Sequence, residues 1–220
     1  MHAAAQPAPY PPPQNVLQLS AAGTVEVQQD LLTMTLTTSR DGPDPAAVQS
    51  QLKTALDAAL NEARKNAQPG QLDVRTGNFA LYPRNNRDGK ITGWQGTAEL
   101  VLEGRDFQRI TQTGGRTTSM TLGGVGFGLS REQRARTETE AQSMAIERFK
   151  AKAAELAKSF GFSGYTLREV AVNAGDQVYP QRGRVMMMEA AKAASMDQAV
   201  PVEAGKTVVT VNVSGSVQLR

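Results

Sequence analysis

Alternating apolar and polar positions predict antiparallel strands along much of the chain. The clearest case is the last stretch, "KTVVTVNVSGSVQLR", where one face carries only apolar residues: Val209, Val211, Val213, Val217 and Leu219. Such alternation is typical of an antiparallel strand with one face on the core and the other facing solvent. The stretch "VLQLSAAGTVEVQQDLLTMTLTTSR" alternates twice and predicts two consecutive strands, and "YTLREVAVN" predicts another.

Two segments instead follow the helical period. Residues 44–67 carry one apolar stripe, and Asp44 is placed to cap the helix just before a proline in its first turn. Residues 131–160 form the longest predicted helix, in which Ser130 begins a capping box and Gly161 ends the helix. The predicted fold class is therefore α+β, with antiparallel β-sheets and one-sided packing of two main helices.

A long β-hairpin is predicted at residues 71–103. It contains "GNFALYPRNNRDGKITGWQGTAELVLEG", in which Asp88-Gly89 is a strong turn pair between two strand-like runs. The structural interpretation is that Trp94 and Tyr82 cover the sheet near the turn as an aromatic cross-strand pair. The hairpin is then an ordinary element of the fold.

The tip of this hairpin also has a functional interpretation. Arg84, Arg87 and Lys90 lie close to Trp94, the only tryptophan of the chain. An aromatic platform beside three cations would suit an anion or another small ligand. We keep these four residues as candidate ligand contacts.

Two further motifs have plain structural interpretations. "RDFQRITQTGG" predicts a short helix with Asp106 in the capping position. "GGVGFG" lacks both the G-x-G-x-x-G spacing and the lysine-serine pair of a phosphate loop, so it predicts a flexible strand or a bulge.

Residues 175–204 are the irregular part of the chain, with three consecutive methionines at Met186, Met187 and Met188. Thioethers are soft ligands that suit Cu(I), but adjacent residues of a helix point about 100° apart and could not face one ion there. We therefore interpret the segment as a hydrophobic loop that packs on the domain or on a neighbouring subunit. These three methionines are candidate partner contacts.

Composition narrows the chemistry. The chain of 220 residues has no cysteine, and its single histidine, His2, stands beside the initial methionine. Thiolate chemistry, Ser-His-Asp catalysis and ordinary zinc sites are thereby excluded, and no catalytic, cofactor-binding or metal-ligating residues are expected. A net charge of +3 without a basic stripe gives no indication of nucleic-acid binding. No apolar run approaches the ~18 residues of a transmembrane helix, although a peripheral membrane contact remains compatible with the sequence.

Residues 1–15 form an Ala/Pro-rich segment that predicts a disordered leader before a domain at 16–220. Its alanine-rich opening resembles the remainder of a signal-peptidase site. We therefore expect a periplasmic or secreted bacterial protein, lipid-anchored if the native precursor carries a lipobox.

The order of these elements resembles the SIMPL-domain family, long catalogued as a domain of unknown function in bacterial periplasmic proteins. The resemblance covers residues 16–220 and rests on "SAAGTVEVQQD" with Gly23 and Asp30, on "DVRTGNFALYP" followed by "ITGWQGTAELVLEGRDF", on "EAQSMAIERFKAKAAELAKSFGF" and on "VPVEAGKTVVTVNVSGSVQL". Gln29 departs from the family pattern, which has a proline before Asp30.

The resemblance implies an exported α+β protein, linked in some members to stress tolerance or surface antigenicity and assembling in others into rings or channels. It carries no catalytic residues over. Our leading hypothesis is a non-enzymatic protein of the cell envelope that acts by self-association or partner binding, as a homo-oligomer or with an envelope protein. The alternative is an anion or small-ligand binder that uses the hairpin tip.

Overall fold

The computed structural model describes residues 14–174 and 202–220. Almost all of the predicted leader, and most of the methionine-rich segment with Met186, Met187 and Met188, lie outside the described residues. The described residues divide into two compact units, and each has its own sheet and its own hydrophobic core. The two units are described separately below.

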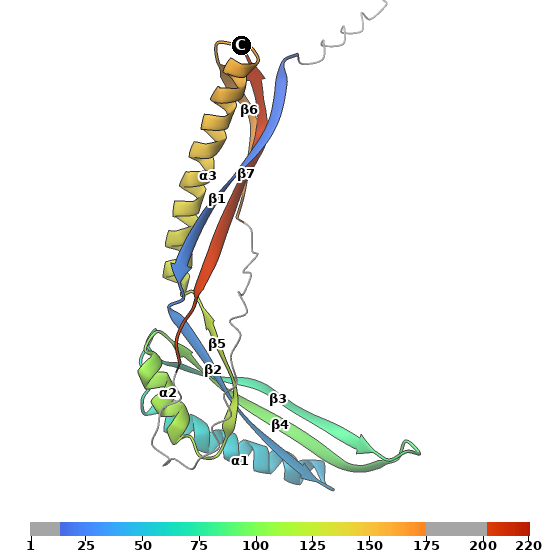
Figure 1. Ribbon diagram of the computed structural model, residues 1–220. Helices are drawn as coiled ribbons and strands as arrows, with labels where there is room; N and C mark the ends of the chain where they lie inside the picture. Colours follow the sequence, from blue (N-terminus) through green and yellow to red (C-terminus); the bar gives the residue numbers. More distant parts are fainter. Residues whose placement is uncertain (1–13, 175–201) are drawn as a thin grey trace, which may run out of the picture. The chain divides into compact units, whose positions relative to one another are not determined.

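Unit 1 consists of residues 14–27, 134–174 and 208–220. Its three-stranded antiparallel sheet has the order β1-β7-β6, formed by β1 (Val16–Gln28), β7 (Lys206–Leu219) and β6 (Tyr165–Ala174). The long helix α3 (Arg131–Ser159) runs along one face of these strands (Figure 1). The core between helix and sheet is made of Leu19, Ala145, Phe149, Ala153, Ala157, Val213, Val217 and Leu219.

Strand β1 and helix α3 approach each other closely at Gly23. A Cβ atom built on this glycine would lie 1.9 Å from the carbonyl oxygen of Ala141 and 2.7 Å from the nitrogen of Ala145. Two cations of the helix, Arg148 and Lys152, donate hydrogen bonds to carbonyl oxygens of β1. Small residues therefore allow the backbone of the strand to touch the backbone of the helix.

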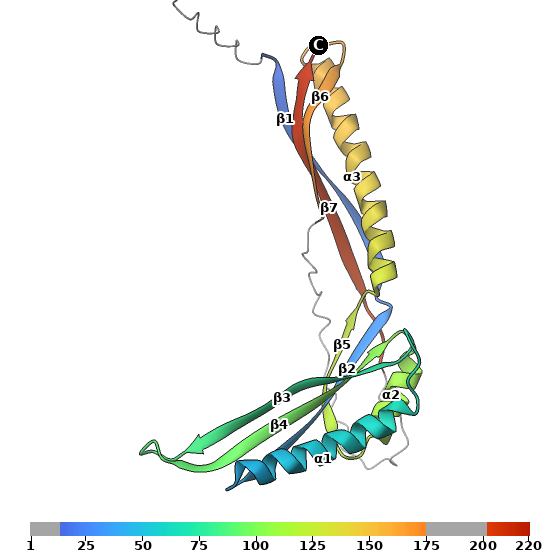
Figure 2. The ribbon, with the colours of Figure 1, turned by 180° about the vertical axis from the view of Figure 1, so that it is seen from behind.

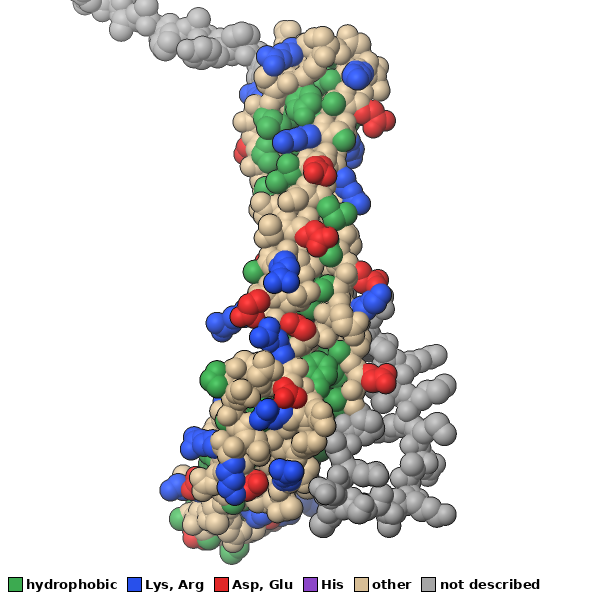
Figure 3. Space-filling view, turned by 90° about the vertical axis from the view of Figure 1, so that its left-hand side faces the viewer, with side chains coloured by type: hydrophobic (Ala, Val, Ile, Leu, Met, Phe, Trp, Pro, Cys, Tyr) green, Lys and Arg blue, Asp and Glu red, His purple; other side chains and the backbone are tan. Residues whose placement is uncertain are grey.

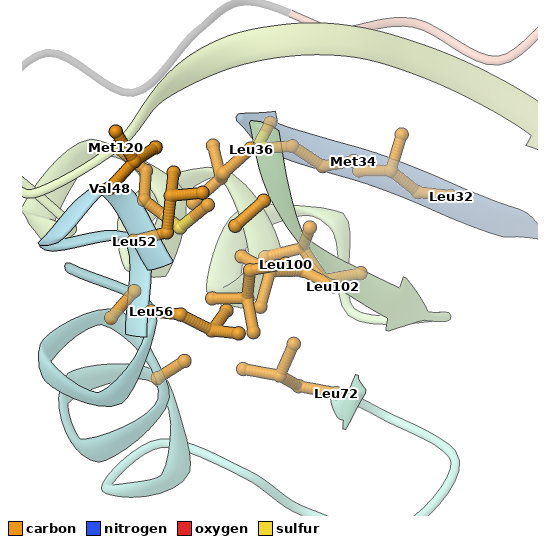
Figure 4. Close-up of a cluster of buried hydrophobic side chains, with 14 residues drawn as sticks. Leu32, Met34, Leu36, Val48, Leu52, Leu56, Leu72, Leu100, Leu102 and Met120 are labelled. Carbon is orange, nitrogen blue, oxygen red and sulfur yellow. The ribbon is translucent and has the colours of Figure 1, made fainter. Parts of the chain in front are cut away.

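Unit 2 consists of residues 28–133 and 202–207. Its four-stranded antiparallel sheet has the order β3-β4-β2-β5, formed by β2 (Leu31–Gly42), β3 (Asp73–Asn85), β4 (Ile91–Gly104) and β5 (Thr121–Gly128). Two helices, α1 (Pro45–Arg64) and α2 (Phe107–Arg116), pack on one face of this sheet (Figure 2). The core between them includes Leu32, Met34, Leu36, Val48, Leu52, Leu72, Leu100, Leu102, Ile110 and Met120 (Figure 4).

The helices begin where the sequence predicts. The Asp44 carboxylate accepts the backbone N–H groups of Ala46 and Ala47 at 3.3 and 3.1 Å. The Ser130 hydroxyl accepts the N–H of Gln133 at 3.2 Å, which caps α3. These side chains satisfy N–H groups that a helix terminus leaves without intrahelical partners.

Ser130 also makes a contact that no sequence pattern indicated. The Asp30 carboxylate accepts the backbone N–H of Ser130 at 2.7 Å and its hydroxyl at 2.6 Å. Both residues belong to unit 2. Asp30, which lies between β1 and β2 along the chain, therefore holds the residue that caps α3.

The predicted fold class is confirmed, since the two sheets are antiparallel and each carries its helices on one face. The predicted helices at 44–67 and 131–160 correspond to α1 and α3, and the predicted hairpin corresponds to β3 and β4. The glycine-rich stretch is strand β5, and its pairing with β2 is shifted by a bulge. Where the sequence suggested one domain at 16–220, the structure has two units.

Candidate functional site

The end of the β3–β4 hairpin holds the cations singled out from the sequence. Strand β2 accompanies β4 only as far as the pair Gly42–Trp94. Beyond that pair, β3 and β4 continue as two strands and end in a turn (Figure 1). The end of the hairpin is therefore exposed on both of its faces.

Asn86 organises the turn. Its side-chain oxygen accepts the N–H groups of Asp88 and Lys90 at 3.0 and 2.9 Å, and Gly89 adopts a φ of 78°. A left-handed backbone of this kind favours glycine at the position. Arg87 and Lys90 are exposed in this turn. The structure thus brings these two cations into one short segment.

Arg84 and Trp94 lie on opposite faces of the sheet. Arg84 pairs with Gly93, so the next residue along β4, Trp94, points to the other side. Trp94 packs against the core of unit 2, whereas the Arg84 guanidinium lies 3.9 Å from the Asp41 carboxylate. The structure therefore does not place the indole beside Arg84 as a shared ligand platform.

The expected cross-strand pair of Tyr82 and Trp94 is wrong. Tyr82 lies opposite Gln95, and Trp94 lies opposite Pro83. Consecutive residues of a strand point to opposite faces, so the two aromatic rings leave the sheet on different sides. Trp94 packs against the core, and Tyr82 is 59% exposed.

Strand β6 of unit 1 presents a second candidate site, which sequence reasoning missed. It lies at an edge of its sheet, with β7 on one side and no strand of the described residues on the other. Leu167, Val170 and Val172 are 51%, 43% and 44% exposed. These apolar side chains lie along an edge whose outward backbone groups have no neighbouring strand.

The register explains this exposure. Leu167 lies opposite Val217, Val170 opposite Gly215 and Val172 opposite Val213. Their side chains therefore point to the face that α3 covers, because Val213 and Val217 belong to the core beneath that helix. The strand residues of this core come from β1 and β7, with Tyr165 at the beginning of β6 packed against it. The rest of β6 lies beyond the helix.

The sequence of β6 held one visible signal of this arrangement. Arg168 and Glu169 interrupt the alternation of apolar residues, and the structure has a register shift between Leu167 and Glu169. Alternation in "YTLREVAVN" predicted the strand, but it could not show that the helix would leave its apolar face uncovered. That outcome depends on where a helix distant in the sequence packs.

The other face of the unit 1 sheet carries a shallow polar groove. It is lined by Gln18, Leu19, Ser20, Glu169, Ser214, Gly215 and Ser216. A Cβ atom on Gly215 would lie 2.2 Å from the Glu169 carbonyl oxygen, so the strands meet closely there. The groove offers hydroxyl, amide and carboxylate groups without a buried nucleophile or base beside them.

The described residues give few other indications of chemistry. None of their His, Cys, Asp or Glu side chains gathers in a group of three or more that could hold a metal ion. In the same part of the chain, no helix has both the length and the apolar character needed to cross a membrane. Acidic and basic side chains are interspersed on the face shown in Figure 3.

Comparison with known proteins gives one family. Residues 17–217 match the SIMPL family, described as a protein of unknown function (DUF541). No curated protein matches the chain. Among solved structures, the chain is similar to AtUAH in its crystal structure in complex with glyoxylate, with 11% identity and a TM-score of 0.26. That similarity covers 60% of this chain and 34% of the AtUAH chain, and a TM-score this low does not indicate a shared fold. The match to the SIMPL model spans nearly all of the described residues, and the chain therefore belongs to the SIMPL family.

Proposed function

We propose that this protein acts without catalysis, as an exported component of the cell envelope that associates with itself or with a protein partner. The observation that carries the proposal is the uncovered edge of β6, with Leu167, Val170 and Val172 half-exposed along it. Family membership adds no established activity, since the family is described as one of unknown function.

An edge of this kind is unusual in a protein that acts alone. Soluble proteins commonly protect sheet edges with charged side chains, prolines or short strands, because unpaired N–H and C=O groups recruit further strands. Residues 170–174, "VAVNA", contain neither a charge nor a proline. The bulge at Arg168 protects only the beginning of β6. The remaining edge is suited to accept a strand.

Sedimentation velocity over a wide concentration range tests the proposal, together with crosslinking of the protein in its native envelope. We expect either concentration-dependent assembly or capture of a specific protein partner. A protein that stays monomeric at high concentration, and that crosslinks to no other protein in the envelope, would contradict the proposal.

Export is supported by the Ala/Pro-rich segment at residues 1–15 and by the family resemblance. Fractionation of cells that express the native reading frame tests this part. Recovery in the cytoplasmic fraction alone would contradict it.

A role in stress tolerance, which the resemblance also suggests, is tested by comparing the survival of a deletion strain with that of the complemented strain.

A second candidate function is anion binding at the hairpin tip. It is favoured by Arg87 and Lys90, which are exposed in one turn and form no ion pair within the described residues. Calorimetric titration with inorganic phosphate and with a polyphosphate tests it. The double variant Arg87→Ala/Lys90→Ala should abolish any heat of binding, while Lys53→Ala on the exposed face of α1 should leave it unchanged. A flat titration of the wild type would contradict this function.

A further inference from the structure

We infer that the partner of β6 is β6 of a second copy of this chain, paired antiparallel about a two-fold axis at Ala171. The two three-stranded sheets then form one continuous six-stranded sheet. This inference rests on the proposed self-association and specifies its surface, its partner and its register.

The faces of β6 constrain the register. Val170 and Val172 point to the helix-covered face, whereas Ala171 and Asn173, opposite Ser214 and Asn212, point to the other face. A two-fold axis that joins two antiparallel strands in one sheet stands perpendicular to the sheet, so each face continues into the same face of the second copy. Residues of like face must therefore oppose each other.

An axis at Ala171 satisfies this condition with matched side chains. Val170 then lies opposite Val172 of the second copy, and Val172 opposite its Val170. Four valines gather on the helix side of the joined sheet, between the parts that the two α3 helices cover, and each half-exposed valine is covered by another. Opposed valines remove apolar surface from water and pack well across paired strands. Ala171, the smallest side chain available there, opposes itself at the axis.

The polar residues agree with the same register. Glu169 lies opposite Asn173 of the second copy, whose amide N–H can donate to the carboxylate. An axis at Glu169 would instead oppose two carboxylates, which is destabilising. An axis at Val170 would place Val172 against Arg168 in the bulge. An axis at Val172 would set Val170 against Ala174, a smaller apolar contact.

The other edge of the same sheet is a poorer match for β6. The exposed residues along β1 are mostly polar, among them Gln18, Ser20, Thr24 and Glu26. The helix-side residues of β1, such as Leu19, are already buried under α3 of their own copy, so pairing β6 with β1 of another copy would not let half-exposed valines cover each other. Like edges therefore pair with like, which closes a two-fold dimer and leaves β1 outside the contact.

Disulfide trapping tests the register, because the wild-type chain has no cysteine. In the full chain, Ala171→Cys places two thiols opposite each other, at a Cα separation of about 5 Å. A disulfide requires roughly 4.4–6.8 Å, so mild oxidation should give a covalent dimer. Asn173→Cys is the matched control on the same face. Its two thiols would lie four residues apart along the strands, about 13 Å, and should not link.

A mixing experiment gives a second readout. In a dimer of Val170→Cys alone or of Val172→Cys alone, the Cα atoms of the two cysteines lie about 8 Å apart, which is too far for a disulfide. Oxidation of the two variants together should therefore yield a mixed dimer that neither yields alone. Mixed and self-linked dimers in equal amounts would overturn the register.

Affinity is measured separately from trapping. Val170→Lys introduces a charge into the valine cluster and should weaken dimerisation at least tenfold in sedimentation equilibrium. Gln18→Lys introduces the same charge at the β1 edge and should leave dimerisation unchanged. Thermal melts of both variants show whether the fold is intact.

The outcomes separate this inference from the proposed function. If the wild type assembles but Ala171→Cys links no better than Asn173→Cys, the β6 pairing is overturned while self-association stands. If the wild type is monomeric at all concentrations and Ala171→Cys does not link, the β6 pairing is overturned as well. Crosslinking to another envelope protein then decides whether the partner-binding form of the proposal survives.

Discussion

At the scale of single residues, Gly23 shows how closely two backbones meet. Replacement by alanine would put a Cβ atom 1.9 Å from the Ala141 carbonyl oxygen, and neither backbone can rotate away. We expect Gly23→Ala to lower the free energy of unfolding by about 1–3 kcal/mol or more, the range typical of overpacked cores. Urea denaturation measures the loss.

Gly126→Ala on β5 is the control for this prediction. A Cβ atom there would have no heavy atom within 4 Å. Its stability should stay near that of the wild type. Equal stability of the two variants would show that β1 and α3 do not touch at Gly23.

Asp106 should make stability depend on pH. Its carboxylate accepts the backbone N–H of Arg109 at 3.0 Å and the Nε–H of the same residue at 3.1 Å. The backbone hydrogen bond is the main cause that lowers the pKa of Asp106; partial burial opposes it, and the Arg109 side chain adds to it. Because the folded state lowers this pKa, the ionised carboxylate stabilises the fold fully at pH values above the pKa of the unfolded state. The contribution disappears as the pH falls through the pKa of the folded state.

We therefore expect Asp106→Ala to lower the free energy of unfolding by about 1 kcal/mol at neutral pH, the usual effect of removing an N-cap. The difference from wild type should shrink in acid, because protonation removes the same contribution from the native residue. Asp106→Asn keeps a capping oxygen but cannot titrate, so its stability should depend less on acid pH than that of the wild type. If the free energies of unfolding of wild type and Asp106→Ala differed by the same amount from neutral to acid pH, the lowered pKa of Asp106 would be contradicted.

At the scale of elements, β7 provides the sharpest comparison between neighbouring positions. Val211 is 1% exposed, and Asn212, one residue along, is exposed. Val211→Asp buries an unpaired charge and should cost several kcal/mol, a large part of a typical total stability of about 5–15 kcal/mol. Asn212→Asp should be nearly silent. Thermal melts of the two variants would contradict the assignment of faces if their midpoints coincided.

Local patterns account for most of what the sequence could predict. The caps at Asp44, Asp106 and Ser130 act within three residues along the chain, and the faces of β7 follow from simple alternation. The hairpin turn at Asp88-Gly89 is equally local. Elements of this kind can be assigned from a single sequence because their physical causes lie within one segment.

The remaining features depend on contacts between distant segments. Asp30 and Ser130 are 100 residues apart, and the sequence around either residue does not indicate that the two are in contact. The open edge of β6 depends on α3 packing over β1 and β7. The separation of Arg84 from Trp94 depends on the register of β3 against β4, and alternation through an irregular turn does not determine that register.

At the scale of the whole molecule, two separate cores predict separate stabilities. Leu100 is fully buried in the core of unit 2, and Phe149 is 2% exposed in the core of unit 1. We expect Leu100→Ala, a change that typically costs about 2–5 kcal/mol, to speed hydrogen exchange in unit 2 and to change it little in unit 1. Phe149→Ala should do the reverse. Uniform acceleration over both units in either variant would show that they unfold as one.

The two-stranded end of the β3–β4 hairpin has a consequence for how the chain tolerates changes in length. Residues inserted between Arg87 and Gly89 would extend a turn that neither core contacts, because β2 stops at the pair Gly42–Trp94. Doubling the length of a flexible loop costs only about 0.6 kcal/mol of closure entropy, and exposed tips are the usual sites of tolerated insertion. A peptide tag or a fluorescent reporter can therefore be placed there while both units keep their fold.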